Sequence, residues 1–146
     1  MYQDINYLSK LDWRALILIS GGCNLNCRYC LVNKSKSGTN YPNFLKDTNE
    51  AIANGSYLNV FKEAFKKYNQ SPNRVELMQL WGNEPTLMLH DLNKVWPDWV
   101  AAFPGIERIE FSTNGIDCTD DIFDFILTVE KNATHYMNFS IQYSYE

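Results

Sequence analysis

Cys23, Cys27 and Cys30 lie within eight residues of one another and are the residues best suited by type and spacing to chemistry. Thiolate sulfur is the soft ligand that iron–sulfur clusters and zinc select. A structural zinc site needs a fourth cysteine or histidine, and the only candidates are Cys118, His90 and His135, none of which stands at zinc-finger spacing. A [4Fe–4S] cluster on three cysteines would leave one iron open to another ligand, which is a catalytic arrangement. Three ordinary buried cysteines are a further alternative, which the polar residues between them disfavour.

The spacing C-x3-C-x2-C, with the aromatic Tyr29 before the last cysteine, resembles the signature of the radical S-adenosylmethionine (radical SAM) superfamily. The resemblance implies that Cys23, Cys27 and Cys30 hold a [4Fe–4S] cluster whose fourth iron is chelated by S-adenosylmethionine. It further implies that one electron from the cluster cleaves the cofactor to a 5′-deoxyadenosyl radical, which abstracts hydrogen from a substrate. Tyr29 would then lie near the adenine.

Three later segments also resemble cofactor-binding segments of the superfamily. Trp81-Gly82-Asn83-Glu84-Pro85-Thr86 is similar to a Gly-Gly-Glu-Pro-Thr segment that binds the methionine ammonium, and Asn83 departs from the usual second glycine. Ser112-Thr113-Asn114-Gly115 and the strand that carries Ser140 are weaker matches. By itself, the segment at residues 81–86 is equally typical of a tight turn with a surface Glu, and the segment at residues 112–115 is more typical of an Asn-Gly turn that caps a strand. The resemblance implies that the cofactor-binding residues are Tyr29, Gly82, Asn83, Glu84, Ser112, Asn114 and Ser140, and it assigns no catalytic side chain.

Strand patterns alternate with helix patterns along the chain. Strands are predicted at 15–20, 75–81, 106–112 and 136–143, and helices at 56–68, 91–102 and 119–131, with Ser56 and Thr119 as helix caps and a long loop over 31–47. The first strand is apolar on both faces, as expected for a strand buried on both sides. Strands separated by helices predict an α/β fold with a parallel sheet, whose ligands bind beyond the carboxyl ends of the strands.

The resemblance implies that these repeated βα units are the first four strands of a partial (β/α)6 TIM-like barrel. Residues 1–146 would form a single radical SAM core domain that is incomplete, because the chain ends directly after the fourth strand. Trp96, Trp99 and Phe103 are expected in the core, and Cys118 is expected to be a small buried thiol.

Composition bounds the partners and the compartment. Apolar residues make up 45% of the chain, the net charge is −4, and no basic block suggests nucleic-acid binding. No apolar run approaches the ~20 residues of a membrane helix, and Met1–Arg14 lacks the apolar stretch of a signal peptide, so we expect a cytoplasmic protein. The resemblance implies S-adenosylmethionine as partner, an electron donor such as flavodoxin or ferredoxin, and an unknown substrate, with a lean toward a peptide or protein side chain. The alternative is a non-catalytic iron–sulfur or zinc-binding module.

Overall fold

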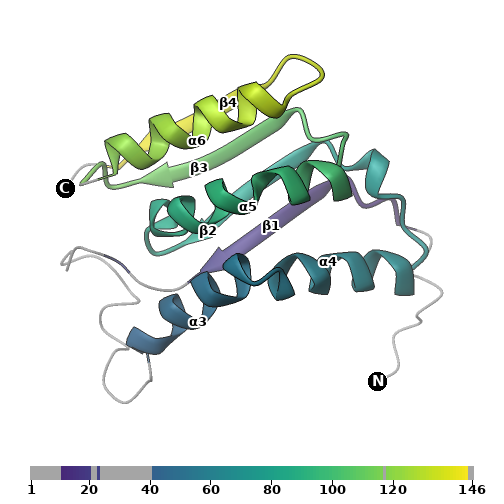
Figure 1. Ribbon diagram of the computed structural model, residues 1–146, viewed down its shortest axis with the longest axis horizontal. Helices are drawn as coiled ribbons and strands as arrows, with labels where there is room; N and C mark the ends of the chain where they lie inside the picture. Colours follow the sequence, from purple (N-terminus) through teal and green to yellow (C-terminus); the bar gives the residue numbers. More distant parts are fainter. Residues whose placement is uncertain (1–10, 21–22, 24–40, 117, 145–146) are drawn as a thin grey trace.

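The computed structural model describes residues 11–20, 23, 41–116 and 118–144, and contains one parallel sheet of four strands in the order β1-β2-β3-β4. The strands are β1 (Ala15–Ser20), β2 (Leu77–Gly82), β3 (Arg108–Thr113) and β4 (Asn138–Tyr143). Neighbours in the sheet are also neighbours in the chain, and because every pair is parallel, all carboxyl ends lie at the same edge (Figure 1). This confirms the predicted α/β fold with parallel pairing.

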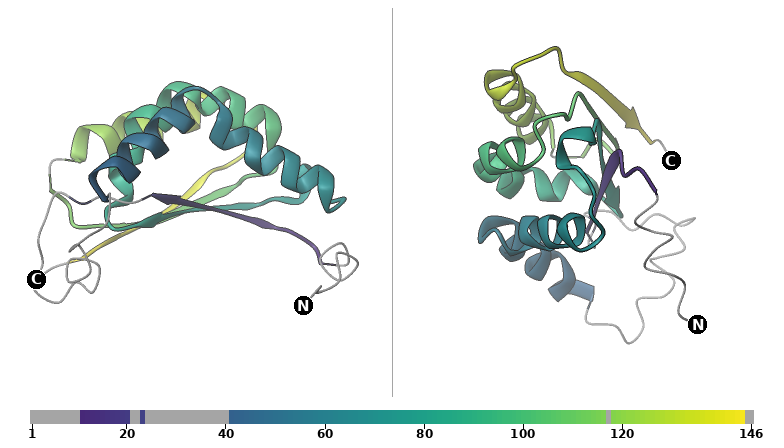
Figure 2. Two further views of the ribbon diagram at one scale, coloured as in Figure 1. Left: turned by 90° about the horizontal axis from the view of Figure 1, so that it is seen from below. Right: turned by 90° about the vertical axis from the view of Figure 1, so that its right-hand side faces the viewer.

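The helices of the described residues all cover one face of this sheet, and the other face carries none (Figure 2). They are α3 (Tyr41–Ala53), α4 (Ser56–Lys67), α5 (Leu89–Ala102) and α6 (Thr119–Asn132), with 3-10 turns η1 (Pro72–Arg74) and η2 (Pro85–Met88) beside β2. No helix among these residues is long and apolar enough to cross a membrane.

The one-sided cover corrects the prediction for β1. Leu16 and Leu18 are buried against the helices, whereas Ile17 and Ile19, which alternate with them, are 39% and 52% exposed. The sequence pattern of β1 was that of a strand covered on both faces. The described helices cover only one, because side chains of a strand alternate between the two faces.

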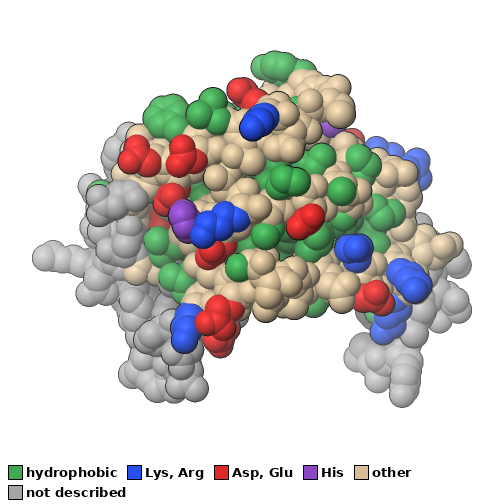
Figure 3. Space-filling view, in the orientation of Figure 1, with side chains coloured by type: hydrophobic (Ala, Val, Ile, Leu, Met, Phe, Trp, Pro, Cys, Tyr) green, Lys and Arg blue, Asp and Glu red, His purple; other side chains and the backbone are tan. Residues whose placement is uncertain are grey.

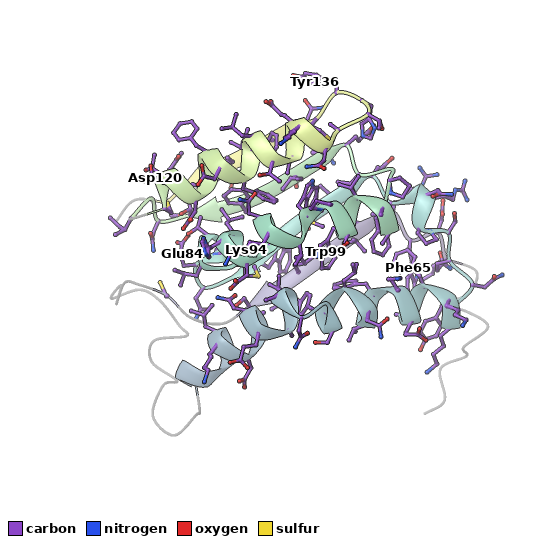
Figure 4. The ribbon with its side chains drawn as sticks, in the orientation of Figure 1. Phe65, Glu84, Lys94, Trp99, Asp120 and Tyr136 are labelled. Carbon is purple, nitrogen blue, oxygen red and sulfur yellow. The ribbon has the colours of Figure 1, made fainter. Side chains whose placement is uncertain are left out.

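Aromatic side chains fill the space between the sheet and the helices. Trp96, Trp99 and Phe103 of the α5 region are at most 1% exposed, which confirms them as core residues. Figure 4 shows Trp99 and Phe65 in this layer between α4 and α5, and the rings of Phe65 and Phe103 meet edge to face at 5.1 Å. Cys118 is 4% exposed, as expected.

The structure corrects three local predictions. The expected loop over 31–47 is helical from Tyr41, because α3 begins there and buries Thr48 and Ile52, which lie one turn apart. Ser56 is not the N-cap of α4. Gly55 takes that position with φ +83°, a conformation that favours glycine, and the side chain of Asn54 accepts a hydrogen bond from the Ser56 N–H at 2.9 Å. The N-cap of α6 is Cys118 rather than Thr119.

Candidate functional site

The face of the sheet opposite the described helices, here called the uncovered face, presents its side chains in rows set by the strand register. One row crosses all four strands as Ile17, Gln79, Glu110 and Ser140. Toward the carboxyl ends, the next positions are the paired residues Ile19 and Trp81 on β1 and β2, and Ser112 and Gln142 on β3 and β4. The uncovered face is therefore apolar toward β1 and polar toward β3 and β4.

A cavity of about 650 Å³ lies over this face at the carboxyl ends of the strands. This volume is within the range of about 300–1,000 Å³ that is usual for small-molecule sites. Six of the predicted cluster- and cofactor-binding residues line it: Cys23, Gly82, Asn83, Ser112, Asn114 and Ser140. Among the described lining residues, Glu110 is the one with a charged side chain.

Gly82 allows β2 to approach β1 closely at the rim of this cavity. It has φ +133°, and a Cβ at this position would overlap the backbone carbonyl of Ser20, the last residue of β1. Only glycine combines this backbone conformation with the space available. Gly82 therefore holds together the ends of the two strands that precede Cys23 and Asn83.

Glu84 is placed differently from the other predicted residues. It is 2% exposed, does not line the cavity, and lies near the carboxyl ends of the strands (Figure 4). Its Oε1 accepts hydrogen bonds from the hydroxyls of Thr86 at 2.5 Å and Thr113 at 2.6 Å, and its Oε2 accepts one from the Asn114 N–H at 2.8 Å. The carboxylate thus ties the loop after β2 to the end of β3.

Asn114 contacts both the buried carboxylate of Glu84 and the first cysteine, Cys23. Its Oδ1 accepts a hydrogen bond from the Ile116 N–H at 2.9 Å, and its Nδ2 donates to Cys23 Sγ at 3.8 Å. Asn114 follows β3 and Cys23 follows β1, so the contact joins two segments that are 91 residues apart in the chain.

Two polar pairs on the uncovered face were not singled out from the sequence. Gln79 Nε2 donates to Glu110 Oε2 at 2.9 Å, and the other carboxylate oxygen of Glu110 pairs with Arg108 Nε at 3.1 Å. Ser112 Oγ donates to Gln142 Oε1 at 3.4 Å. The signal that could have revealed the first pair is the alternation of Gln79 and Glu110 with apolar residues along their strands, because such polar residues have to face away from the core.

Three predicted residues, Tyr29, Cys27 and Cys30, lie outside the described residues. Within the part that is described, no group of three His, Cys, Asp or Glu side chains could hold a metal ion, and only Cys23 of the three cysteines falls there.

The donor set around Cys23 nevertheless fits the implied cofactors. A cysteine sulfur stands beside an amide donor, and both residues line the cavity. Among the described residues, Asn83 Nδ2 is buried without a hydrogen-bond partner, although Asn83 lines the cavity. A buried donor without a partner is rare and costly, and at a cavity it is typical of a ligand site.

Comparison with known protein families matches residues 17–146 to the model of the radical SAM superfamily. The comparisons with curated proteins and with solved structures found no match. The matched range contains all three cysteines and every residue of the cavity.

Proposed function

The chain belongs to the radical SAM superfamily, and from this premise we propose that it holds a [4Fe–4S] cluster on Cys23, Cys27 and Cys30 and binds S-adenosylmethionine in the adjoining cavity. The observation that carries the proposal is the meeting of Cys23, Gly82, Asn83 and Asn114 at one cavity, at the carboxyl ends of three parallel strands. In open parallel sheets, ligands bind at this edge.

The residues of this chain bind and orient the cofactor. The backbone after Gly82 offers carbonyl dipoles to the methionine ammonium, with the charge of Glu84 behind it, and Asn83 offers its amide donor. Ser112, Asn114 and Ser140 line the cavity and supply hydrogen-bonding groups at the end of β3 and on β4. By the superfamily resemblance, Tyr29 would contact the adenine. When bound, the cluster and cofactor would supply radical chemistry for hydrogen abstraction from the substrate.

The superfamily resemblance and the uncovered face support a proposal for the substrate class. We propose a peptide or protein side chain as substrate, in line with the Trp-Gly-x-Glu-Pro-Thr segment at residues 81–86. The polar pairs Gln79–Glu110 and Ser112–Gln142 offer hydrogen bonds suited to amide groups, beside the apolar side chains of Ile17 and Trp81. An electron donor of the flavodoxin or ferredoxin type and a cytoplasmic location complete the proposal.

We further propose that the four strands begin a partial (β/α)6 barrel, to which additional βα units are added beyond β4. Among the described residues, the sheet ends at β4, where Phe139 and Ile141 are only partly buried. On α6, Phe123 and Leu127 are 61% and 63% exposed. They lie one turn apart and so form an apolar patch on one face of the helix, as expected where a helix packs against another element. Further strands and helices would cover these groups.

Anaerobic reconstitution with iron and sulfide tests the cluster assignment. We expect about four irons per chain and a brown chromophore, because a [4Fe–4S] cluster assembles on thiolates. Replacement of Cys23, Cys27 or Cys30 with Ala should abolish stable assembly. The matched control is Cys118→Ala, which removes the fourth cysteine of the chain and should leave the iron content unchanged.

Two results would contradict this proposal. One zinc and no iron per chain would favour a structural zinc module. Equal iron loss from Cys118→Ala would show that the three-cysteine assignment is wrong.

A further inference from the structure

The side chain of Asn114 has a defined orientation relative to Cys23. Its Oδ1 accepts the Ile116 N–H at 2.9 Å, which leaves Nδ2 as the atom that faces the cysteine sulfur at 3.8 Å. An amide nitrogen carries two donor hydrogens and no acceptor, so the contact with sulfur is an N–H···S hydrogen bond donated by Asn114.

The backbone of Asn114 is also fixed by a hydrogen bond to the buried Glu84. Its N–H donates to Glu84 Oε2 at 2.8 Å, and Glu84 is itself fixed by the Thr86 and Thr113 hydroxyls. The next residue, Gly115, donates its N–H to Thr113 Oγ1 at 3.1 Å. Because these bonds are buried or partly buried, the amide donor is held toward Cys23 before any cofactor binds.

We propose that Asn114 donates a hydrogen bond to the Cys23 thiolate that raises the reduction potential of the cluster, with Glu84 as the positioning residue that holds Asn114 in place. This inference rests on the proposed function, because it requires Cys23 to be a cluster ligand. Reduction adds one electron, delivered by the flavodoxin- or ferredoxin-type donor, and increases the negative charge on the cluster and its thiolates. A donor dipole aimed at one of these sulfurs stabilises the reduced form more than the oxidised form.

The test is a redox titration of the reconstituted protein, followed by electron paramagnetic resonance in the absence of S-adenosylmethionine. Asn114→Ala removes the donor without adding charge. At a fixed potential, we expect the ratio of reduced to oxidised cluster to fall about tenfold, which corresponds to a midpoint about 59 mV more negative. The control is Gln142→Ala, which lines the same cavity but contacts Ser112 instead, and should leave the midpoint unchanged.

Asn114→Asp separates the hydrogen bond from the shape of the turn. The Asp carboxylate can still accept a hydrogen bond from the Ile116 N–H, so the turn is kept. It has no nitrogen to replace the Nδ2 donor of Asn114. Pulsed electron paramagnetic resonance after exchange into D2O should detect the deuteron that replaces the Asn114 Nδ2 proton, as a coupling to the reduced cluster of the wild type. This coupling should be absent in Asn114→Asp, whereas a purely structural role would leave it in place.

The outcomes distinguish the inference from the proposed function. A wild-type protein that assembles no iron–sulfur cluster would overturn the proposed function and the inference with it. A variant Asn114→Ala that carries a full cluster with the wild-type midpoint, or a deuteron coupling in Asn114→Asp identical to that of the wild type, would overturn the inference alone.

Discussion

Glu84 is a buried carboxylate whose hydrogen bonds are made within the protein. Burial of a charge is costly unless its oxygens are satisfied, and here Thr86, Thr113 and the Asn114 N–H satisfy them. A carboxylate oxygen can accept two hydrogen bonds, and the described residues donate one to Glu84 Oε2, so this oxygen can accept one more. Glu84 can therefore attract a cofactor cation while it keeps its hydrogen bonds to the loop after β2 and to the end of β3.

Glu84→Gln should accordingly destabilise the protein even without cluster or cofactor. We expect the free energy of unfolding to fall by about 1.5–3 kcal/mol, the usual contribution of a hydrogen bond to a charged group. Urea denaturation of the cluster-free protein measures it. The matched control is Glu110→Gln, because the Glu110 side chain is 29% exposed and can exchange its partners for water; its loss should be smaller. Equal stability of Glu84→Gln and wild type would contradict a structural role.

At the scale of elements, Tyr57 joins α4 to the edge of the sheet. β1 is the first strand in the sheet, so the Ile19 backbone groups directed away from β2 need partners outside the strands. The Tyr57 hydroxyl donates to the Ile19 carbonyl at 2.9 Å and accepts from the Ile19 N–H at 2.8 Å. Burial raises the pKa of the Tyr57 phenol above its ordinary value of 10.0, and the hydrogen bond with the Ile19 backbone partly opposes this shift.

Tyr57→Phe should change both the stability and its pH dependence. Near neutral pH, we expect a loss of about 1 kcal/mol from the missing hydrogen bonds. Because the pKa is higher in the folded state, the protonated phenol stabilises the fold fully below pH 10.0, and this stabilisation is lost as the pH rises through the folded pKa. Urea denaturation between pH 7 and pH 11 should therefore show wild type and variant converging at high pH; two parallel curves would contradict this interpretation.

At the scale of the whole molecule, apolar groups gather at the β4 edge. Hydrophobic side chains lie along the edge of the molecule over α6 in Figure 3, where Phe123 and Leu127 are 61% and 63% exposed. Beside them, the outer edge of β4 has no strand neighbour among the described residues. An exposed strand edge next to apolar side chains favours association with other chains.

We therefore expect the chain of residues 1–146 to associate as its concentration rises, and the double substitution Phe123→Glu and Leu127→Lys to weaken this association. Both side chains are largely exposed, so the free energy of unfolding should change by no more than about 0.5 kcal/mol per site. Sedimentation velocity over a concentration series measures the association. Val60→Lys is the control, because Val60 is equally exposed at 67% but lies on α4, on the β1 side of the sheet. An equal effect of Val60→Lys would mean that the association does not involve this edge.

The succession of the four strands with α4, α5 and α6 and the parallel pairing could be predicted from the sequence, because both depend on local periodicity and on chain connectivity. Local patterns were less reliable where packing decides the outcome. The polar, Gly-, Pro- and Asn-containing composition of residues 31–47 predicts a loop, yet residues 41–47 begin α3, a helix that the sequence did not reveal and that buries Thr48 and Ile52 further along. The composition of β1 predicts burial on both faces, whereas the described helices cover one face only.

At the site, the cysteine spacing and the Gly-Asn-Glu-Pro-Thr segment are visible in the sequence because their chemistry lies within a few consecutive residues. The contacts between segments are not. Glu84 meets Thr113 across 29 positions, and Asn114 meets Cys23 across 91, because strands far apart in the chain end at the same edge of the sheet. Only the tertiary structure therefore decides that Glu84 is buried and joins the loop after β2 to the end of β3, and that Asn114 contacts the Cys23 sulfur.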